Sequence, residues 1–248
     1  MKTFGIIGNP LGHSFSKSYF TNKIKTENID AEFLNFELAK IEDLKEVLNS
    51  NPNLKGFCVT IPYKEAIIPF LDELDPLAEK IGAANSIQVR LKNGKIWMKG
   101  YNTDIYGFTE SLNPFLGNTS PKALVLGTGG ASKAIAKGLE TLNIEYRYVS
   151  RSAGKENHLT YDELNAEIIQ EYKLIVNCSP LGTFPNTEEC PNIPYEHLTP
   201  EHYLYDLVYN PDQTLFMRKG AEKGAKTHNG LRMLHLQAEQ SWMYWNEE

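Results

Sequence analysis

The stretch that decides the fold is Ala123-Leu124-Val125-Leu126-Gly127-Thr128-Gly129-Gly130-Ala131-Ser132. Its apolar run predicts a buried strand over 123–127, and the pattern over 133–142 predicts a helix directly after the glycines. Glycines allow a sharp turn and a close backbone approach, and a helix N-terminus offers free N–H groups to an anion. The order is typical of a dinucleotide site, in which the glycine-rich turn and the helix N-terminus hold the pyrophosphate.

The residues after the next strand indicate which dinucleotide is bound. A second strand is predicted over 144–149, and Ser150-Arg151-Ser152 follows where an NAD site usually has an acidic residue for the ribose. A guanidinium there suits a 2′-phosphate, so the sequence predicts NADP. A glycine-rich turn without a ligand is the competing interpretation, because Ser132 replaces the third glycine of the usual signature. The flanking strand, the helix and Arg151 favour the cofactor.

Composition narrows the class of protein. The chain has 248 residues, 41% of them hydrophobic and 23% charged, which fits a globular protein of one or two domains. The net charge of −6 without a basic stripe argues against a nucleic-acid partner. No stretch is long and apolar enough to predict a membrane span. Three cysteines without zinc spacing predict neither disulfides nor a metal site, and the expected location is the cytoplasm.

The residues before the glycine signature alternate between strand and helix patterns. Strands are predicted over 3–7, 33–38 and 56–61, and a hairpin over 86–99 turns at Asn93-Gly94. Ile67, Phe70, Leu71 and Leu74 have helical spacing, which predicts a helix kinked at Pro69.

The second half continues the alternation, with further strands predicted over 174–177 and 203–209. The final helix, predicted over 231–245, is long enough to return to the first domain. We therefore expect an α/β fold of two domains with a cleft between them. A substrate-binding domain takes residues 1–104 and 231–248, and a Rossmann-type cofactor domain takes 105–230.

Several polar residues stand where predicted strands end. Ser14 and Ser16 lie in a loop after the first strand, where two hydroxyls can hold a carboxylate, although taken alone they are better explained as the N-cap of a helix. Lys64 follows a strand and is a candidate proton carrier; a solvated surface lysine is the alternative. Asp104 either caps the next helix or holds Lys64 and a substrate hydroxyl together. Asn85 either satisfies local backbone groups or lines the cleft.

Nine segments together resemble the shikimate dehydrogenase family in order and approximate spacing. They are HSFS (13–16), VTIPYKE (59–65), GAANS (82–86), YNTD (101–104), GTGGAS (127–132), SRS (150–152), NCSPLG (177–182), YDLVYNP (205–211) and NGLRMLHLQA (229–238). The resemblance implies reduction of 3-dehydroshikimate to shikimate with NADPH, in the chorismate route to aromatic amino acids. It implies a small-molecule substrate and a monomer or homodimer.

The resemblance also assigns roles to residues. Lys64 would be the acid/base and Asp104 its partner. The substrate carboxylate would bind Ser14 and Ser16. The rest of the substrate site would comprise Thr60, Asn85, Asp104, Tyr209 and Gln237. The pyrophosphate would bind Gly127, Thr128, Gly129, Gly130 and Ala131. The 2′-phosphate would bind Ser150, Arg151, Ser152 and Lys155, and Gly230 would lie near the cofactor.

Some positions depart from the family pattern. Cys58 stands where asparagine is usual, and Lys155 where a second arginine is common. Lysine cannot make the bidentate contact of arginine, so the preference for NADP over NAD is expected to be weaker. The alternative functions are a quinate/shikimate dehydrogenase that tolerates NAD or quinate, and a ligand sensor without turnover on the same fold.

Overall fold

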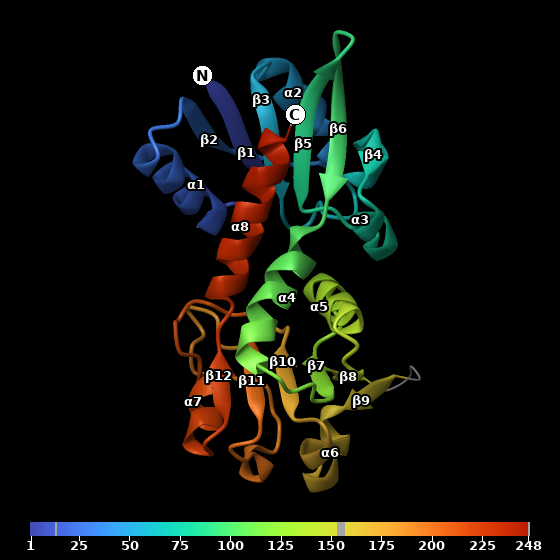
Figure 1. The fold of residues 1–248 in the computed structure, drawn as a ribbon, viewed down its shortest axis with the longest axis vertical. Helices are drawn as coiled ribbons and strands as arrows, with labels where there is room; N and C mark the ends of the chain where they lie inside the picture. Colours follow the sequence, from blue (N-terminus) through green and yellow to red (C-terminus); the bar gives the residue numbers. More distant parts are fainter. Residues whose placement is uncertain (13, 153–156, 248) are drawn as a thin grey trace. The chain divides into compact units, whose positions relative to one another are not determined.

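The structure is a computed structural model and describes residues 1–12, 14–152 and 157–247. It divides into two compact units, residues 1–106 with 236–248 (unit 1) and residues 107–235 (unit 2). The divisions fall inside two helices, α4 (Thr103–Leu116) and α8 (Leu231–Asn246) (Figure 1). Within the described residues, no helix is long and apolar enough to cross a membrane.

Unit 1 is built on a mixed six-stranded sheet in the order β2-β1-β3-β5-β6-β4. Strands β2, β1 and β3 are parallel, whereas β5 runs antiparallel to both β3 and β6. The elements are β1 (Lys2–Gly8), α1 (Phe15–Thr26), β2 (Ala31–Glu37), α2 (Leu44–Ser50), β3 (Leu54–Val59), β4 (Glu73–Leu74), α3 (Pro76–Ile81), β5 (Ser86–Lys92) and β6 (Lys95–Tyr101).

Alternation along the strands gives unit 1 two buried faces. On one face, Phe4 and Ile6 pack with Phe20 of α1 and Trp245 of α8. The opposite face belongs to a second cluster, which includes Ile7, Phe57, Leu44 of α2 and the segment around Ile67. Helices therefore cover one face of the sheet, and α2 with the 63–71 segment covers the other.

The helix predicted through Ile67 and Leu74 is wrong. Only a single 3-10 turn forms, over Ile68–Phe70, and the chain then extends into β4. Pro69 has no N–H for a helix, and the next backbone amides bond to the sheet instead: Asp72 N donates to Met98 O and Asp75 N to Gly100 O. Helix α3 begins after this segment, with Asp75 as its N-cap.

Unit 2 contains an all-parallel sheet in the order β12-β11-β10-β7-β8-β9. Renumbered within the unit, this is the 3-2-1-4-5-6 order of the doubly wound dinucleotide-binding, or Rossmann, fold. The elements are β7 (Ala123–Leu126), α5 (Gly130–Thr141), β8 (Tyr146–Ser150), β9 (His158–Thr160), α6 (Ala166–Glu171), β10 (Leu174–Asn177), β11 (Tyr203–Asp206), α7 (Leu215–Glu222) and β12 (Lys226–His228).

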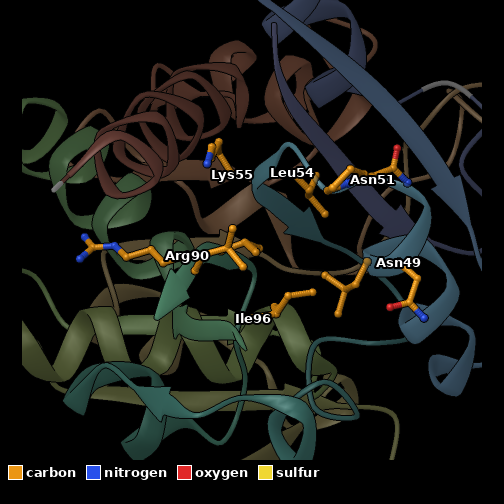
Figure 2. A pocket seen from close by; sticks show the side chains of 10 residues that line it. Asn49, Asn51, Leu54, Lys55, Arg90 and Ile96 are labelled. Carbon is orange, nitrogen blue, oxygen red and sulfur yellow. The ribbon is translucent and has the colours of Figure 1, made fainter. Parts of the chain in front are cut away.

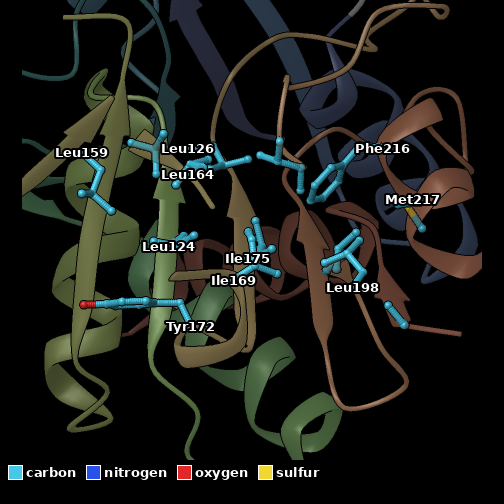
Figure 3. Close-up of a cluster of buried hydrophobic side chains, with 14 residues drawn as sticks. Leu124, Leu126, Leu159, Leu164, Ile169, Tyr172, Ile175, Leu198, Phe216 and Met217 are labelled. Atoms are coloured by element: carbon cyan, nitrogen blue, oxygen red, sulfur yellow. The ribbon is translucent and has the colours of Figure 1, made fainter. Parts of the chain in front are cut away.

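The strands of unit 2 are buried on both faces, as a parallel sheet requires. Leu124 and Ile175 point into one cluster with Ile169 of α6 and Phe216 of α7 (Figure 3). Residues alternating with these join a second cluster with α4 and α5. The strand predicted over 174–177 is confirmed as β10, whereas the strand predicted over 203–209 is shorter, because β11 ends at Asp206.

Candidate functional site

The candidate proton-transfer pair lies at one edge of the unit 1 sheet. Register places Cys58 opposite Ser86, and Ser86 opposite Tyr101, so the segments after β3, before β5 and after β6 meet there. Lys64 and Asp104 come from two of these segments. The Lys64 Nζ donates to Asp104 Oδ2 at 2.7 Å, with side-chain exposures of 32% and 12%. A half-exposed ammonium is thus held by a largely buried carboxylate.

Neighbouring amides fix Asp104 in place. Asn102 Oδ1 accepts from Asp104 N at 3.1 Å, while Asn102 Nδ2 donates to Ala83 O. Asn85 is buried, and its Oδ1 accepts from both the backbone N at 2.7 Å and the hydroxyl of Thr103. The start of α4 is therefore bonded to the start of β5, which fixes where the Asp104 carboxylate lies.

The two serines lie at the start of α1. Ser14 is the N-cap, and its Oγ accepts from Lys17 N at 3.3 Å, so the capping interpretation is confirmed for Ser14. A capping hydroxyl keeps its own proton, which it can still donate to an anion. Ser16 lies in the first helical turn and hydrogen-bonds Cys58.

Cys58 links the serines to the lysine–aspartate pair. Burial raises the pKa of its thiol to about 12; Asp104 acts in the same direction, while the hydrogen bond with Ser16 and the charge of Lys64 act against it. A neutral thiol therefore lies close to Ser16, Lys64 and Asp104, which places all of them around one end of β3.

Two further predicted residues lie at this edge. Thr60 follows β3 directly, and its N donates to Ile7 O at 3.0 Å. Gln237 is half-buried on α8, one turn before Ser241. Residues four apart share a helix face, and the Ser241 hydroxyl is 3.3 Å from that of Thr103. The Gln237 face of α8 therefore points towards the start of α4.

In unit 2 the glycine signature forms the turn between β7 and α5. Gly127 has a φ of +111°, which favours glycine, and its N donates to Val149 O at 2.9 Å. The helix begins at Gly130 with Gly129 as its N-cap, three residues earlier than predicted. A Cβ built on Gly129 or Gly130 would meet no atom within 4 Å. The loop thus presents open backbone to a ligand at a helix N-terminus.

The residues expected at the 2′-phosphate follow β8. Arg151 and Ser152 are exposed, and the Ser150 hydroxyl donates to Ser152 O at 2.6 Å. Lys155 lies outside the described residues. The exposed Arg151 guanidinium directly after β8 lies where this fold would bind an adenosine 2′-phosphate.

Tyr209 and Gly230 belong to neighbouring loops of unit 2. Tyr209 is half-buried after β11. Gly230 precedes α8, donates its N–H to Val208 O at 3.2 Å, and is buried. A Cβ on Gly230 would lie 2.2 Å from Leu207 O, so the absence of a side chain allows this approach.

Two cavities among the described residues lie away from the predicted site residues. A cavity of about 200 Å³ lies at the opposite edge of the unit 1 sheet, where Leu54, Arg90 and Ile96 surround it (Figure 2). The other is bordered by Cys190, Tyr195 and Lys219 in unit 2. Among the described residues, no cluster of histidine, cysteine and carboxylate side chains could hold a metal ion.

The sequence interpretation missed the residues that support these groups. Asn102 and Thr103 were noted only as parts of a motif, yet they fix Asp104 and Asn85. Asp206 and Asn177 were noted in the same way, and they bond to each other at the ends of β10 and β11. Their signal is a polar residue directly after a buried strand, but only register shows which of these residues meet.

A dinucleotide-type sheet in one unit and a lysine–aspartate pair in the other are what a two-domain, nicotinamide-dependent dehydrogenase requires. Comparison with known proteins agrees. Residues 6–87 match the family described as the shikimate dehydrogenase substrate binding domain. The chain belongs to the shikimate dehydrogenase family.

The similarity extends over almost the whole chain. A shikimate dehydrogenase (NADP(+)) of Methanococcus maripaludis is 35% identical over 98% of this chain and 91% of its own. One of Methanosphaera stadtmanae is 35% identical over 93% of this chain and 86% of its own. The crystal structure of a Thermus thermophilus shikimate 5-dehydrogenase with NADP(H) and shikimate is 29% identical, with a TM-score of 0.83 over 99% of this chain and 94% of that one.

Proposed function

We propose that this protein interconverts shikimate and 3-dehydroshikimate with NADP(H). The observation that carries the proposal is the Lys64–Asp104 pair, held at 2.7 Å at a polar edge of unit 1. Support comes from the curated relatives, which are named shikimate dehydrogenase (NADP(+)). We assign substrate binding to unit 1 and cofactor binding to unit 2.

The substrate carboxylate is assigned to Ser14 and Ser16. Both hydroxyls lie at the first turn of α1, a helix of 12 residues, where the dipole favours an anion. The ring hydroxyls are assigned to the unit 1 residues Thr60, Asn85, Asp104 and Gln237. Because Thr103 occupies Asn85 Oδ1 with two donors, the Asn85 amide N–H₂ is the group we assign to a substrate oxygen.

The residues of unit 2 fit an NADP molecule. Gly129 and Gly130 leave room that a Cβ would fill, at the N-terminus of the 12-residue α5. We assign the pyrophosphate to Gly127–Ala131, and the 2′-phosphate to Ser150, Arg151, Ser152 and Lys155. Gly230 is assigned to the nicotinamide end. When bound, the cofactor supplies or accepts the hydride.

Lys64 acts as the general acid and base of the reaction. During reduction, its ammonium donates a proton to the carbonyl oxygen of 3-dehydroshikimate, which becomes the hydroxyl of shikimate; during oxidation, the neutral amine takes that proton back. Asp104 holds the Lys64 ammonium by an ion pair and accepts a hydrogen bond from the substrate hydroxyl. The surrounding amides keep both groups oriented before the substrate arrives.

The test is a steady-state assay of the purified chain with shikimate and NADP⁺, followed by NADPH absorbance. Parallel assays replace shikimate with quinate and NADP⁺ with NAD⁺. Turnover with shikimate and NADP⁺ that exceeds the other pairs supports the proposal. Comparable rates with quinate or NAD⁺ would indicate the broader quinate/shikimate enzyme. Binding of shikimate without turnover would indicate a ligand sensor.

The proposed setting is the reducing cytoplasm. Cys58, Cys178 and Cys190 are all free thiols in the structure. Unpaired, half-buried cysteines are typical of proteins kept in a reducing compartment.

A further inference from the structure

A buried carboxylate at the end of β11 has no role in the chemistry assigned above. Asp206 has no exposed surface. Its Oδ1 accepts from Asn177 Nδ2 at 2.9 Å and from Val208 N at 3.0 Å, and its Oδ2 accepts from Thr214 Oγ1 at 2.6 Å. Three donors from three segments thus converge on one carboxylate.

Among the described residues, the Asp206 carboxylate has no ion-pair partner, unlike that of Asp104. Its titratable neighbours are the Cys178 thiol and the Tyr195 phenol, whose pKa values are raised by burial first and by Asp206 in addition. Burial raises the pKa of Asp206 itself to about 6, against the hydrogen bonds from Thr214, Val208 and Asn177. A buried charge of this kind costs free energy, which its hydrogen bonds must offset.

The first segment bonded to Asp206 begins the loop after β10. While Asn177 Nδ2 donates to Asp206, Asn177 Oδ1 accepts from both the N and the hydroxyl of Ser179. Farther along, Phe184 N donates to Asn210 O at 3.1 Å. The loop over 179–185 is therefore attached at its start to Asp206 and at its end to the loop after β11.

The second segment is the loop over 207–211, which carries Tyr209. Val208 is fixed on both sides, because its N donates to Asp206 and its O accepts from Gly230 N at 3.2 Å. Leu207 N donates to Asn177 O at 3.0 Å. Val208 therefore links the Asp206 carboxylate to Gly230 by hydrogen bonds, and it directly precedes Tyr209 in the chain.

Both loops border the proposed cofactor site. Leu126, Asn177 and Asp206 are paired in register at the carboxyl ends of β7, β10 and β11. A Cβ on Gly127 would lie 3.6 Å from the carbonyl carbon of Cys178. In sheets of this order, ligands bind at this edge, where the strand order reverses between β7 and β10.

We propose that Asp206 is a positioning residue that holds loops 179–185 and 207–211 in the arrangement required for hydride transfer. The inference rests on the proposed function. Asp206 touches neither substrate nor cofactor; it acts through Val208, Asn177 and Thr214, which place Tyr209 and the backbone beside Gly230.

The test compares the full chain with Asp206→Asn, which keeps the shape and removes the charge. We expect kcat to fall about ten- to hundredfold, because small displacements of reacting groups have effects of this size. The dissociation constant for NADP⁺ should change less than about threefold, since the assigned phosphate-binding residues are untouched. Amide hydrogen exchange in peptides covering 179–185 and 207–211 should become faster than in the parent chain.

The pH profile separates positioning from a general loss of structure. Protonated Asp206 must use one oxygen as a donor, so kcat of the parent chain should decrease below about pH 6. Asp206→Asn should lose this acid limb. Thr214→Val removes a donor to the carboxylate and should shift the limb to higher pH, a measurement that remains if Asp206→Asn does not fold.

Thr214 also caps α7, so a second cap serves as control. Asn165 caps α6 in the same unit, with its Oδ1 accepting from Ile168 N at 3.0 Å. Asn165→Ala should leave the acid limb in place. An acid limb that stays in Asp206→Asn, or exchange in both loops that is unchanged, would overturn the inference. If the parent chain does not turn over shikimate, the proposed function fails, while the exchange comparison still decides the role of Asp206.

Discussion

Lys64 and Asp104 lie 40 positions apart in the sequence, and their charged groups meet at 2.7 Å because the 63–67 segment and the start of α4 leave the same edge of the unit 1 sheet. The carboxylate is more buried than the ammonium. The arrangement leaves the Lys64 ammonium accessible and holds it in place through the buried Asp104 carboxylate, as proton transfer to a bound substrate requires.

Lys64→Ala should lower kcat by about 10²- to 10⁴-fold, the usual contribution of a general acid or base. The dissociation constant of shikimate should change far less, because the serines and Asn85 are left in place. Stopped-flow turnover and equilibrium binding give the two quantities. Equal losses in both would remove Lys64 from the proton-transfer role.

Lys99→Ala is the matched control for this variant. Lys99 also forms an ion pair on the unit 1 sheet, with Glu73, and is a half-exposed lysine. It is not among the residues assigned to the site. Its replacement should leave kcat unchanged, so a fall comparable to that of Lys64→Ala would point to a general electrostatic effect.

The sequence predicts most of the sheet strands because apolar runs and glycine turns are local signals. Strand β10 matches its predicted bounds, and Asn93-Gly94 adopts the positive φ values that the hairpin requires. The helix predicted across Pro69 fails because periodicity does not show that backbone amides bond to β6 instead. Local pattern cannot report such tertiary hydrogen bonds.

The candidate site could likewise be predicted from local sequence motifs only in part. Residues that touch ligands in the family resemblance can be listed from motifs, so Lys64 and Asp104 are identified before their contact is known. Asp206, Asn102 and Thr103 act only through other residues of the chain. Their roles depend on register between strands and on the geometry of single hydrogen bonds, which no single-sequence pattern contains.

Arg151→Ala should raise KM for NADP⁺ by about 10- to 100-fold, the range for losing hydrogen bonds to a charged group. KM for NAD⁺ should remain nearly unchanged, because NAD⁺ lacks the 2′-phosphate that the guanidinium is assigned to bind. Arg147→Ala is the control, since Arg147 lies on β8 and its guanidinium donates to His158 O. It should leave the ratio of the two KM values unchanged. An unaltered ratio of the two KM values in Arg151→Ala would mean that another group reads the phosphate.

Two glycines of unit 2 should differ in how alanine affects stability and cofactor binding. At Gly230 a Cβ would lie 2.2 Å from Leu207 O, so the backbone must shift, at a cost of about 1–3 kcal/mol in the free energy of unfolding. At Gly129 a Cβ meets open space, and Gly129→Ala should leave stability nearly unchanged while raising KM for NADP⁺. Urea unfolding and steady-state kinetics separate the effects. A stable Gly230→Ala protein would contradict the close packing.

The last prediction concerns how stability depends on pH through Asp206. Its pKa is raised from 3.8 to about 6, so the folded state binds a proton that the unfolded state releases between these values. Stability from this group is therefore greatest below about pH 4 and is lost as pH rises towards 6, by about 3 kcal/mol in total.

His202 and His228 have pKa values lowered by burial, and their titration has the opposite effect, favouring folding as pH rises. Because Asp206→Asn retains both histidines, subtracting its stability from that of the parent chain isolates the carboxylate. The difference, measured by urea unfolding at about pH 5 and pH 7, should shift in favour of the asparagine variant at the higher pH. A constant difference across that interval would mean that Asp206 titrates as an ordinary carboxyl group.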